Sequence, residues 1–389
     1  MSVIESIEIT VATVDDPGVM DRSPENSTTD GGLPPSGTSD ESQNQRSGGE
    51  SPQVVIVTVR SSDGIEGHGF GWGIKGGMRV AHAIAEVYRP ELIGEDPFDR
   101  EKLWHKAQRA DRFGGHAPIT AYGPLDVALW DIAGQAAGIP LYKYIGAYRN
   151  KIPAYASSPF MTHPSDYAEL ALQAQSDGFM AFKLHPPGEP ELDIECCAAV
   201  RDAVGPGMEL MSDPVGGAYD HEDAIRVGRA LEKLDFLWLE EPLYDHDIHG
   251  LEKLTSKLDI PICAGEWKSD FFSKVNYLKN GAADIIRADV SWTGGITGTL
   301  KSAHFAEGFG VNCELHMTVL SLMDVANLHV ALAIKNCRYF ELPYPDGATF
   351  GIAQPVAIDS CGYVSPSSAA GLGVELDWDA IDRQTVAII

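Results

Sequence analysis

Three short apolar runs, each ending in a carboxylate, decide the fold of this chain: MELMSD at residues 208–213, FLWLE at 236–240 and PICAGE at 261–266. A stretch with helical character follows each run. Strands that alternate with helices pair in parallel, because the crossover between parallel neighbours needs a dozen or more residues. The pattern therefore predicts one parallel sheet in which three successive strands end in Asp213, Glu240 and Glu266.

The same pattern continues on both sides of these runs. An upstream run leads into Lys183 and His185, and later runs end in Asp289, His316 and Glu341. From the first carboxylate onward, the terminal residues stand 27, 26, 23, 27 and 25 positions apart by subtraction, which is the length of one strand plus one helix. Eight such units close into a barrel with its chemistry at the carboxyl ends of the strands. Any one of these acids could be a solvated strand end or a helix cap. Ionisable residues at the same position of six successive units, however, indicate the open end of a barrel that carries an active site.

The composition is that of a large globular protein with an acidic excess. The 389 residues are 44% hydrophobic. That is enough for a barrel, which takes about 250 residues, and for a smaller domain besides. With 29 Lys+Arg against 56 Asp+Glu, the formal net charge is -27. This charge argues against nucleic acid or an anionic membrane as a partner, and an acidic substrate would need positive charge from a metal or a lysine.

Cysteine usage and the N-terminus both favour the cytoplasm. The 6 cysteines form no CxxC pair, which predicts free thiols in a reducing compartment. The first residues lack the basic region and the apolar run of a signal peptide, and the sequence has no run of 18 apolar residues. We therefore expect a soluble cytoplasmic protein.

The N-terminal part predicts an antiparallel sheet. Residues 2–14 alternate between apolar and polar, and residues 54–59 are apolar and rich in valine. The turn signal SDG at 62–64 leads into a returning strand at 65–73, as in a hairpin. Residues 15–52 are rich in Ser, Thr, Gly, Pro and acids, so this insert is expected to be flexible.

Helices are predicted to follow the hairpin and to complete an α+β domain. Helical periodicity covers residues 78–93 and 97–109, and it is strongest at 120–137, where Gly138 and then Pro140 end the helix. Beyond Glu341 no further repeat is legible. We expect the α+β domain at 1–145, the barrel at 146–342, and a C-terminal segment at 343–389 that packs back on the first domain.

The three strand-end carboxylates predict a metal site. Their hard oxygens suit a divalent cation of the magnesium type, which leaves positions open for water or substrate. The second run ends in two acids, and alternation along a strand lets only one of them face the barrel axis together with Trp238. We assign Glu240 to the metal and Glu241, which precedes Pro242, to a structural role.

A histidine and an aspartate at the ends of adjacent strands predict a general base. The carboxylate of Asp289 beside the imidazole of His316 would fix its tautomer and raise its basicity, so that it can take a proton near neutral pH. A lone histidine is more often an ordinary polar side chain, but this one ends a strand next to a strand that ends in aspartate. Lys183 would place a cation beside the metal, where it could hold a substrate carboxylate and stabilise negative charge.

These residues together resemble the enolase superfamily and, within it, the mandelate racemase subgroup of the mandelate racemase/muconate lactonizing enzyme family. The resemblance extends to DVALWDIAG at 126–134, WLEEP at 238–242 and GGIT at 294–297. It implies a modified (β/α)7β TIM barrel and an α+β capping domain built from the N-terminal region and the C-terminal tail. It also implies a homo-oligomer, a dimer or an octamer.

The resemblance assigns a role to each strand-end residue. One Mg²⁺ per subunit would be bound by Asp213, Glu240 and Glu266. His316 and Asp289 would form the catalytic dyad, and Glu341 would hydrogen-bond the enediolic oxygen. The chemistry implied is removal of the proton next to a carboxylate, which enolase-superfamily sites perform with a Lys or His base and magnesium.

One position departs from the family pattern. The subgroup often has Lys-x-Lys on the second strand, and here the second position is His185. A racemase needs competent groups on both faces of its substrate, whereas a dehydratase can work with His316 and at most one helper. This favours a dehydratase of a sugar-derived polyhydroxy acid that gives a 2-keto-3-deoxy acid. An epimerase, racemase or cycloisomerase stays an alternative, because His185 could itself accept a proton.

Two functions from other classes stay open as well. A barrel glycosidase could use Glu240 and Glu266 as acid and nucleophile without a metal, which would leave the other site residues idle. A non-catalytic binding protein could have kept the same residues. If the protein is an enzyme, its substrate specificity is expected to come from the capping loops, and Trp72 and Lys75 are candidate substrate contacts there.

Overall fold

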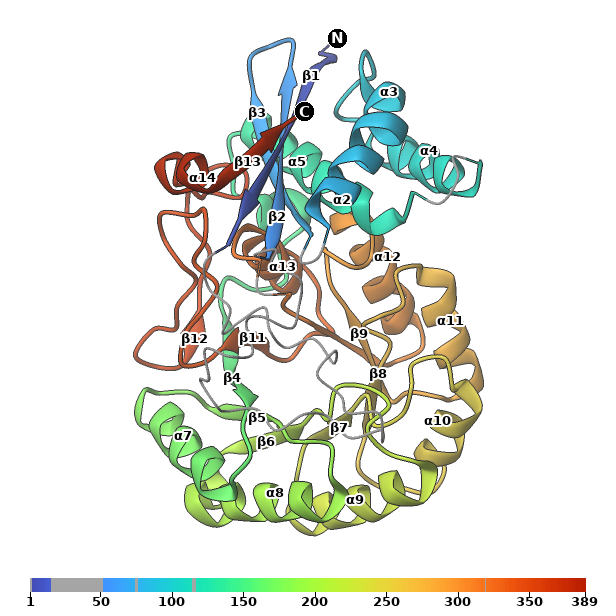
Figure 1. Cartoon of the computed structure of the whole chain (residues 1–389), viewed down its shortest axis with the longest axis vertical. Helices are drawn as coiled ribbons and strands as arrows, with labels where there is room; N and C mark the ends of the chain where they lie inside the picture. Colours follow the sequence, from blue (N-terminus) through green and yellow to red (C-terminus); the bar gives the residue numbers. More distant parts are fainter. Residues whose placement is uncertain (1, 15–51, 74–75, 114–116, 319) are drawn as a thin grey trace.

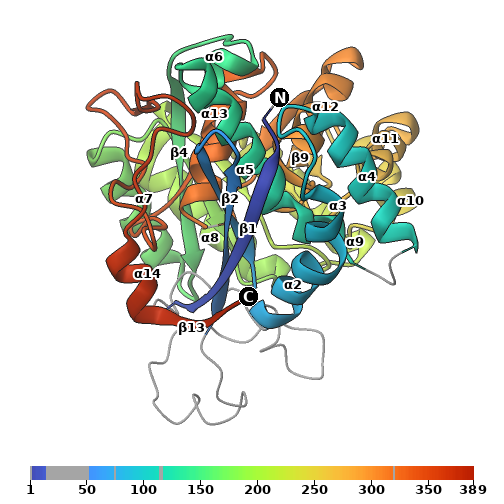
Figure 2. The same cartoon turned by 90° about the horizontal axis from the view of Figure 1, so that it is seen from above.

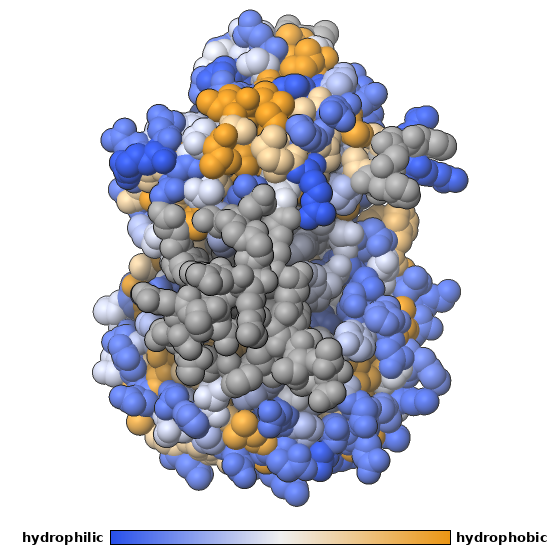
Figure 3. Space-filling view, viewed as in Figure 1, coloured by the Kyte–Doolittle hydropathy of each residue, from blue (hydrophilic) through white to orange (hydrophobic). Residues whose placement is uncertain are grey.

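A computed structural model describes residues 2–14, 52–73, 76–113, 117–318 and 320–389. Almost all of the predicted insert lies outside these ranges, as does Lys75. The described chain forms a barrel with a smaller sheet-and-helix cap above it (Figure 1). On the face shown in Figure 3, the barrel surface that is not covered by grey atoms is mostly hydrophilic, and apolar residues gather higher up, over the cap.

Within the described residues, eight parallel strands form the barrel: β4 (Ile152–Phe160), β5 (Ala181–His185), β6 (Glu209–Ser212), β7 (Trp238–Glu240), β8 (Ile262–Ala264), β9 (Ile285–Ala288), β10 (Asn312–Leu315) and β11 (Phe340–Pro343). They are hydrogen-bonded in the order β10-β9-β8-β7-β6-β5-β4-β11. No ladder joins β10 to β11 among the described residues, but the Glu314 carboxylate accepts hydrogen bonds from the N–H groups of Arg338 (2.9 Å) and Tyr339 (3.2 Å) across that seam. The predicted barrel is confirmed, and it is nearly closed.

The helices of the β/α units lie outside the strands (Figure 1). They are α7 (Pro164–Ser176), α8 (Pro190–Val204), α9 (His221–Lys233), α10 (Ile248–Thr255), α11 (Phe271–Asn280), α12 (Gly295–Gly308) and α13 (Leu322–Ala333), with a short 3₁₀ turn, η4 (Gly205–Gly207). No helix in the described ranges has the length and apolar character needed to cross a bilayer. All the cysteines are free, as expected, and all but Cys361 are buried.

Side chains inside the barrel form two layers. The lower layer is an apolar cluster of Tyr155, Ala181, Met211, Trp238, Cys263 and Tyr339. Because side chains alternate along a strand, the positions two residues further on face the same way. Those positions hold Ser157, Lys183, Asp213, Glu240, Gly265 and Glu341. Strand periodicity thus places polar groups directly above an apolar plug, at the mouth of the barrel.

The cap contains a four-stranded antiparallel sheet in the order β13-β1-β2-β3. Its strands are β1 (Ile4–Thr13), β2 (Gln53–Ser61), β3 (Glu66–Trp72) and β13 (Thr385–Ile388). Since β13 pairs with β1, the C-terminal tail does return to the cap, as predicted. On the way, β12 (Tyr363–Val364) pairs with β4, and α14 (Trp378–Gln384) precedes β13. Seen from above, β1 and β2 lie between α4 on one side and α14 on the other (Figure 2).

The cap helices follow the predicted periodicity with one difference. The stretch predicted as a helix at 78–93 consists of α2 (Gly77–Ala83), a π-helical turn η3 (Ile84–Tyr88) and α3 (Arg89–Leu92). The others are α4 (Arg100–Phe113), α5 (Ile119–Ala137) and α6 (Leu141–Ile145). Gly138 adopts the left-handed conformation with φ 69 and ends α5 where the sequence predicted. The boundaries at residues 145 and 342 stay predictions.

The cap helix α5 is anchored to the barrel at the N-terminus of α12. The buried Asp126 carboxylate accepts hydrogen bonds from the N–H (2.8 Å) and hydroxyl (2.7 Å) of Thr297. Such a cap satisfies N–H groups that have no partner within the helix. A Cβ on Gly295 would lie 2.4 Å from the Cβ of Asp126, so only glycine fits there. The motifs DVALWDIAG and GGIT therefore meet, and they hold the cap on the barrel.

Candidate active site

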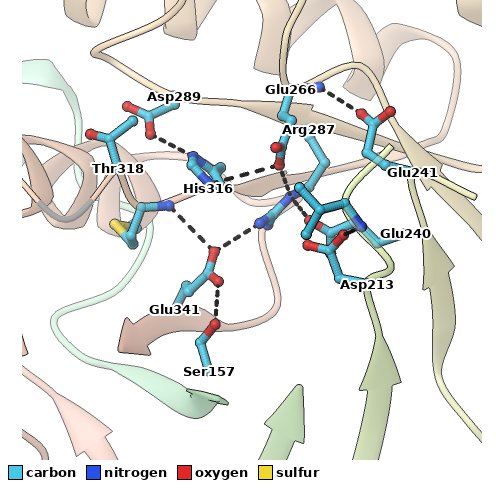
Figure 4. Close-up of polar contacts among 12 residues, drawn as sticks. Ser157, Asp213, Glu240, Glu241, Glu266, Arg287, Asp289, His316, Thr318 and Glu341 are labelled. Carbon is cyan, nitrogen blue, oxygen red and sulfur yellow. Dashed lines mark hydrogen bonds and ion pairs between the residues drawn. The ribbon is translucent and has the colours of Figure 1, made fainter. Parts of the chain in front are cut away.

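The three predicted metal ligands lie together at the mouth of the barrel. One oxygen from each of Asp213, Glu240 and Glu266 lies within 4.8 Å of the other two, and all three residues are buried (Figure 4). They follow or end β6, β7 and β8. Burial and, to a smaller extent, the charges of Asp213 and Glu240 outweigh the nearby His316 and raise the pKa of Glu266 to about 7. Three carboxylates at this spacing repel one another unless a cation lies between them.

Two fully buried cations stabilise this cluster. The Nζ of Lys183 lies 3.1 Å from Asp213, 3.2 Å from Glu240 and 2.9 Å from Glu341. The Arg287 guanidinium lies 2.8 Å from Glu240 through Nε, and its Nη2 donates to Glu341 at 2.8 Å. Although burial disfavours charge, the carboxylates keep the pKa of both Lys183 and Arg287 well above the ordinary values.

The charges of the site leave room for a divalent cation. Within the part of the chain that the structure describes, four carboxylates (Asp213, Glu240, Glu266 and Glu341) face two fixed cations, Lys183 and Arg287. One oxygen of Glu266, Oε2, is buried and accepts no hydrogen bond from the described residues. Buried charges are stable only when they are paired, and oxygen-only ligand sets suit Mg²⁺. The donor set therefore fits the expected metal, with Asp213, Glu240 and Glu266 as the residues that would hold it.

The predicted dyad is formed. The His316 Nδ1 lies 2.9 Å from Asp289 Oδ2, and because a carboxylate can only accept, Nδ1 carries the proton. The Nε2 lies 3.8 Å from Glu266. Burial lowers the pKa of His316, but Glu266, Asp289 and Glu341 outweigh it and raise the value to about 9. Positive charge placed among these carboxylates would lower this pKa toward the range of a general base.

Asn327 on α13 holds the dyad in place. Its side-chain amide donates to Asp289 Oδ1 and to the carbonyl oxygen of His316, both at 3.1 Å. The backbone N–H of Ser291 also donates to Asp289 Oδ1, at 2.7 Å. These donors leave the other oxygen of Asp289 directed at the imidazole. No local pattern in the sequence points to Asn327, because its partners Asp289 and His316 lie on other elements.

His185 joins the site from the side of Lys183. Its Nδ1 lies 2.7 Å from the carbonyl oxygen of Ser158, which can only accept, so Nδ1 carries a proton. Its Nε2 lies 3.3 Å from Asp213. The two imidazoles of the site thus touch different carboxylates of the triad, His185 at Asp213 and His316 at Glu266.

Two further residues of the site were not predicted. Arg287 lies on β9, two positions before Asp289, and had no predicted role. Ser157 on β4 donates to Glu341 Oε1 at 2.8 Å. Strand alternation could have found both, since Arg287 faces the same way as Asp289, and Ser157 the same way as Tyr155.

Trp72 lies at the junction of cap and barrel. Its ring centroid is 5.4 Å from that of Trp292, which lies 4.8 Å from that of Trp267. Trp292 follows Asp289, so Trp72 packs against a loop that leaves the mouth, and Trp292 in turn contacts Trp267 in the loop after Glu266. Trp267 is 46% exposed. A substrate contact by Trp72 stays a prediction, and Lys75 lies outside the described residues.

Comparison with known proteins places this geometry in a family. Residues 43–146 match the N-terminal domain of mandelate racemase/muconate lactonizing enzymes, and residues 166–380 match the enolase C-terminal domain-like family. L-talarate/galactarate dehydratase of Salmonella typhimurium is 34% identical over 286 residues, which are 72% of this chain and 70% of the relative. D-galactarolactone cycloisomerase of Agrobacterium fabrum is 29% identical over 345 residues, 84% of this chain and 90% of the relative.

A solved structure agrees with these relatives. D-glucarate dehydratase from Agrobacterium tumefaciens, complexed with magnesium, has a TM-score of 0.83 and 33% identity, and the match covers 99% of both chains. The resemblance drawn from strand-end residues is thereby confirmed. The chain belongs to the mandelate racemase/muconate lactonizing enzyme family of the enolase superfamily.

Proposed function

We propose that this chain is a Mg²⁺-dependent dehydratase of a sugar-derived polyhydroxy acid, with a 2-keto-3-deoxy acid as product. One observation carries the proposal: the buried triad of Asp213, Glu240 and Glu266 lies between Lys183 and the His316–Asp289 pair. Dehydratases of sugar acids among the relatives support it. The cytoplasmic location and the homo-oligomer stay predictions.

The proton transfers fall to His316. Its Nε2 accepts the proton from the carbon next to the substrate carboxylate, and Asp289 stabilises the imidazolium that forms. Lys183 holds the carboxylate and offsets the negative charge that develops on it. His316 then gives its proton to the departing hydroxyl on the next carbon, so that water leaves as the double bond forms. The resulting enol takes up a proton on the carbon that lost its hydroxyl and releases its own hydroxyl proton to become the 2-keto acid.

The remaining groups orient the substrate. When bound by its three carboxylates, Mg²⁺ supplies a Lewis acid that stabilises developing negative charge on the substrate. Lys183 and Arg287 hold the pKa of Glu341 well below its usual range, against the effect of burial. Glu341 is therefore ionised and can only accept a hydrogen bond, from a hydroxyl of the substrate.

Removal of the metal tests this proposal. We expect dialysis against EDTA to abolish both turnover and exchange of the α-proton in deuterium oxide, and added Mg²⁺ to restore both. The measurement is NMR on a library of aldonic and aldaric acids. Full activity without metal would exclude the proposal and favour a glycosidase-type carboxylate pair. A product that keeps the elements of water would point to an epimerase or a cycloisomerase.

His185 distinguishes dehydration from epimerisation. The position of its Nε2 at the triad supports the second candidate, an epimerase or cycloisomerase with a base on each face of the substrate, as does the cycloisomerase among the relatives. In the proposed dehydratase, His185→Gln should leave α-proton exchange within about tenfold of wild type, because His316 removes the proton. In an epimerase, the same change should slow exchange from one epimer by about 10²–10⁴-fold and spare the other. Exchange is followed by NMR with each epimer separately.

A further inference from the structure

Glu266 reaches the metal site differently from the other polar residues of the barrel mouth. On β5, β6 and β7, the polar residue stands two positions after a member of the apolar layer, as strand alternation requires. On β8 this member is Cys263, and two positions later comes Gly265, which has no side chain to offer. Glu266 stands one position further on, where an ideal strand would point it away from the axis. The backbone must therefore turn at Gly265.

The peptide at this turn is held from both sides. The Glu241 Oε1 accepts the N–H of Gly265 at 2.6 Å and the N–H of Glu266 at 3.1 Å (Figure 4). On the other side, Lys274 Nζ donates to the carbonyl oxygen of Gly265 at 2.5 Å and to that of Arg287 at 2.8 Å. Gly265 has φ 103, outside the range of ordinary residues. Both backbone groups of Gly265 are thus fixed by buried side chains.

These two side chains have no other evident task. Glu241 is 1% exposed and Lys274 is 1% exposed. Burying an ionisable group costs several kcal/mol unless it is paired and hydrogen-bonded. Glu241 also adopts φ 41, which is strained for a residue with a side chain. A core of the same volume could be built from apolar residues, so this arrangement indicates a function at Gly265 and at its neighbour Glu266.

We propose that Glu241 and Lys274 are positioning residues, which lock the Gly265 peptide and thereby aim the Glu266 carboxylate at the cation site. Lys274 also ties this peptide to Arg287, so the same contact sets the distance between a metal ligand and the guanidinium beside it. The proposal rests on the metal site of the proposed function. It deepens the structural role that the sequence assigned to Glu241.

The test is the Mg²⁺ affinity of the metal-free protein, measured by isothermal titration calorimetry without substrate. Glu241→Met and Lys274→Met remove the contacts, and we expect each to weaken Mg²⁺ binding by about 10–100-fold, as is typical for residues that orient metal ligands. Glu241→Gln keeps an oxygen for both N–H groups and places its amide where Oε2 has no hydrogen-bond partner. Its affinity should stay within about twofold of wild type. Lys279 is exposed on the same helix, α11, as Lys274, so Lys279→Met is the control. It should leave the Mg²⁺ affinity unchanged.

The outcomes separate this proposal from its alternatives. A loss in Glu241→Gln as large as in Glu241→Met would overturn it, because the charge of Glu241 would then matter rather than its accepted hydrogen bonds. Wild-type affinity in Glu241→Met or Lys274→Met would also overturn it. If the methionine variants do not fold, Glu241→Gln still decides, since it removes the charge and keeps the contacts. No Mg²⁺ binding by the wild-type protein would overturn the metal site itself.

Discussion

His316→Asn is expected to lose dehydration and α-proton exchange together, by about 10²–10⁴-fold in kcat. The asparagine amide can still donate to Asp289, so the surroundings of the dyad should persist. It offers no basic nitrogen in place of Nε2, the atom that lies 3.8 Å from Glu266. The variant should therefore bind Mg²⁺ and fold as the wild type does, and fail only at proton transfer.

The measurements for this variant are kcat, α-proton exchange in deuterium oxide, and Mg²⁺ affinity. Asp289→Asn should lose kcat as well, because an amide can donate to Nδ1 and so favour the tautomer with its proton on Nε2. His304→Asn, an exposed histidine on α12, is the matched control and should keep wild-type kcat. Exchange that survives in His316→Asn would assign the base to another group, and His185 is the one nearest the triad on the other side.

Most of the catalytic groups could be predicted because, in a β/α barrel, the order of the strands in the sequence is also their order around the barrel. Each strand of the repeat delivers its last inward residue to the same rim, so Asp213 and Glu240 meet by alternation alone, whereas Glu266 reaches them through the turn at Gly265. Alternation allowed only one of Glu240 and Glu241 to face the barrel axis, and Glu240 was the predicted ligand. The structure agrees, since Glu240 joins the triad and Glu241 turns to the backbone of the next unit.

Contacts between β/α units that are distant in the sequence could not be predicted from it. The dyad is steadied by Asn327, 38 positions from Asp289, and the barrel seam is bridged by the carboxylate of Glu314. Neither residue has a local pattern that reveals its partner. The π-helical turn of the cap (Ile84–Tyr88) was not predicted, for a different reason. One wide turn changes the spacing of apolar residues too little to be recognised within a helical stretch.

Replacing Arg287 with methionine is expected to lower the free energy of unfolding by about 3–5 kcal/mol, which is typical when one partner of a buried ion pair is removed. Arg287 is fully buried and lies 2.8 Å from both Glu240 and Glu341. Its Nη1 also donates to the carbonyl oxygen of Leu315 at 3.0 Å. Methionine fills similar volume, so the loss would come from two carboxylates left with Lys183 as their remaining fixed cation.

Denaturant unfolding in EDTA and in Mg²⁺ tests this expectation. Arg338→Met is the matched control: this arginine is 47% exposed and pairs with Glu209 at the surface, so its loss should cost at most about 1 kcal/mol. Arg287→Lys keeps the charge but not the planar guanidinium with its several donors. Its free energy of unfolding should lie between those of wild type and Arg287→Met. Because the cluster of Arg287→Met is one charge more negative, Mg²⁺ should stabilise this variant more than it stabilises the wild type. Equal stability of Arg287→Met and wild type in EDTA would mean that the guanidinium does not balance the carboxylates, and the charge argument for a divalent cation would fail with it.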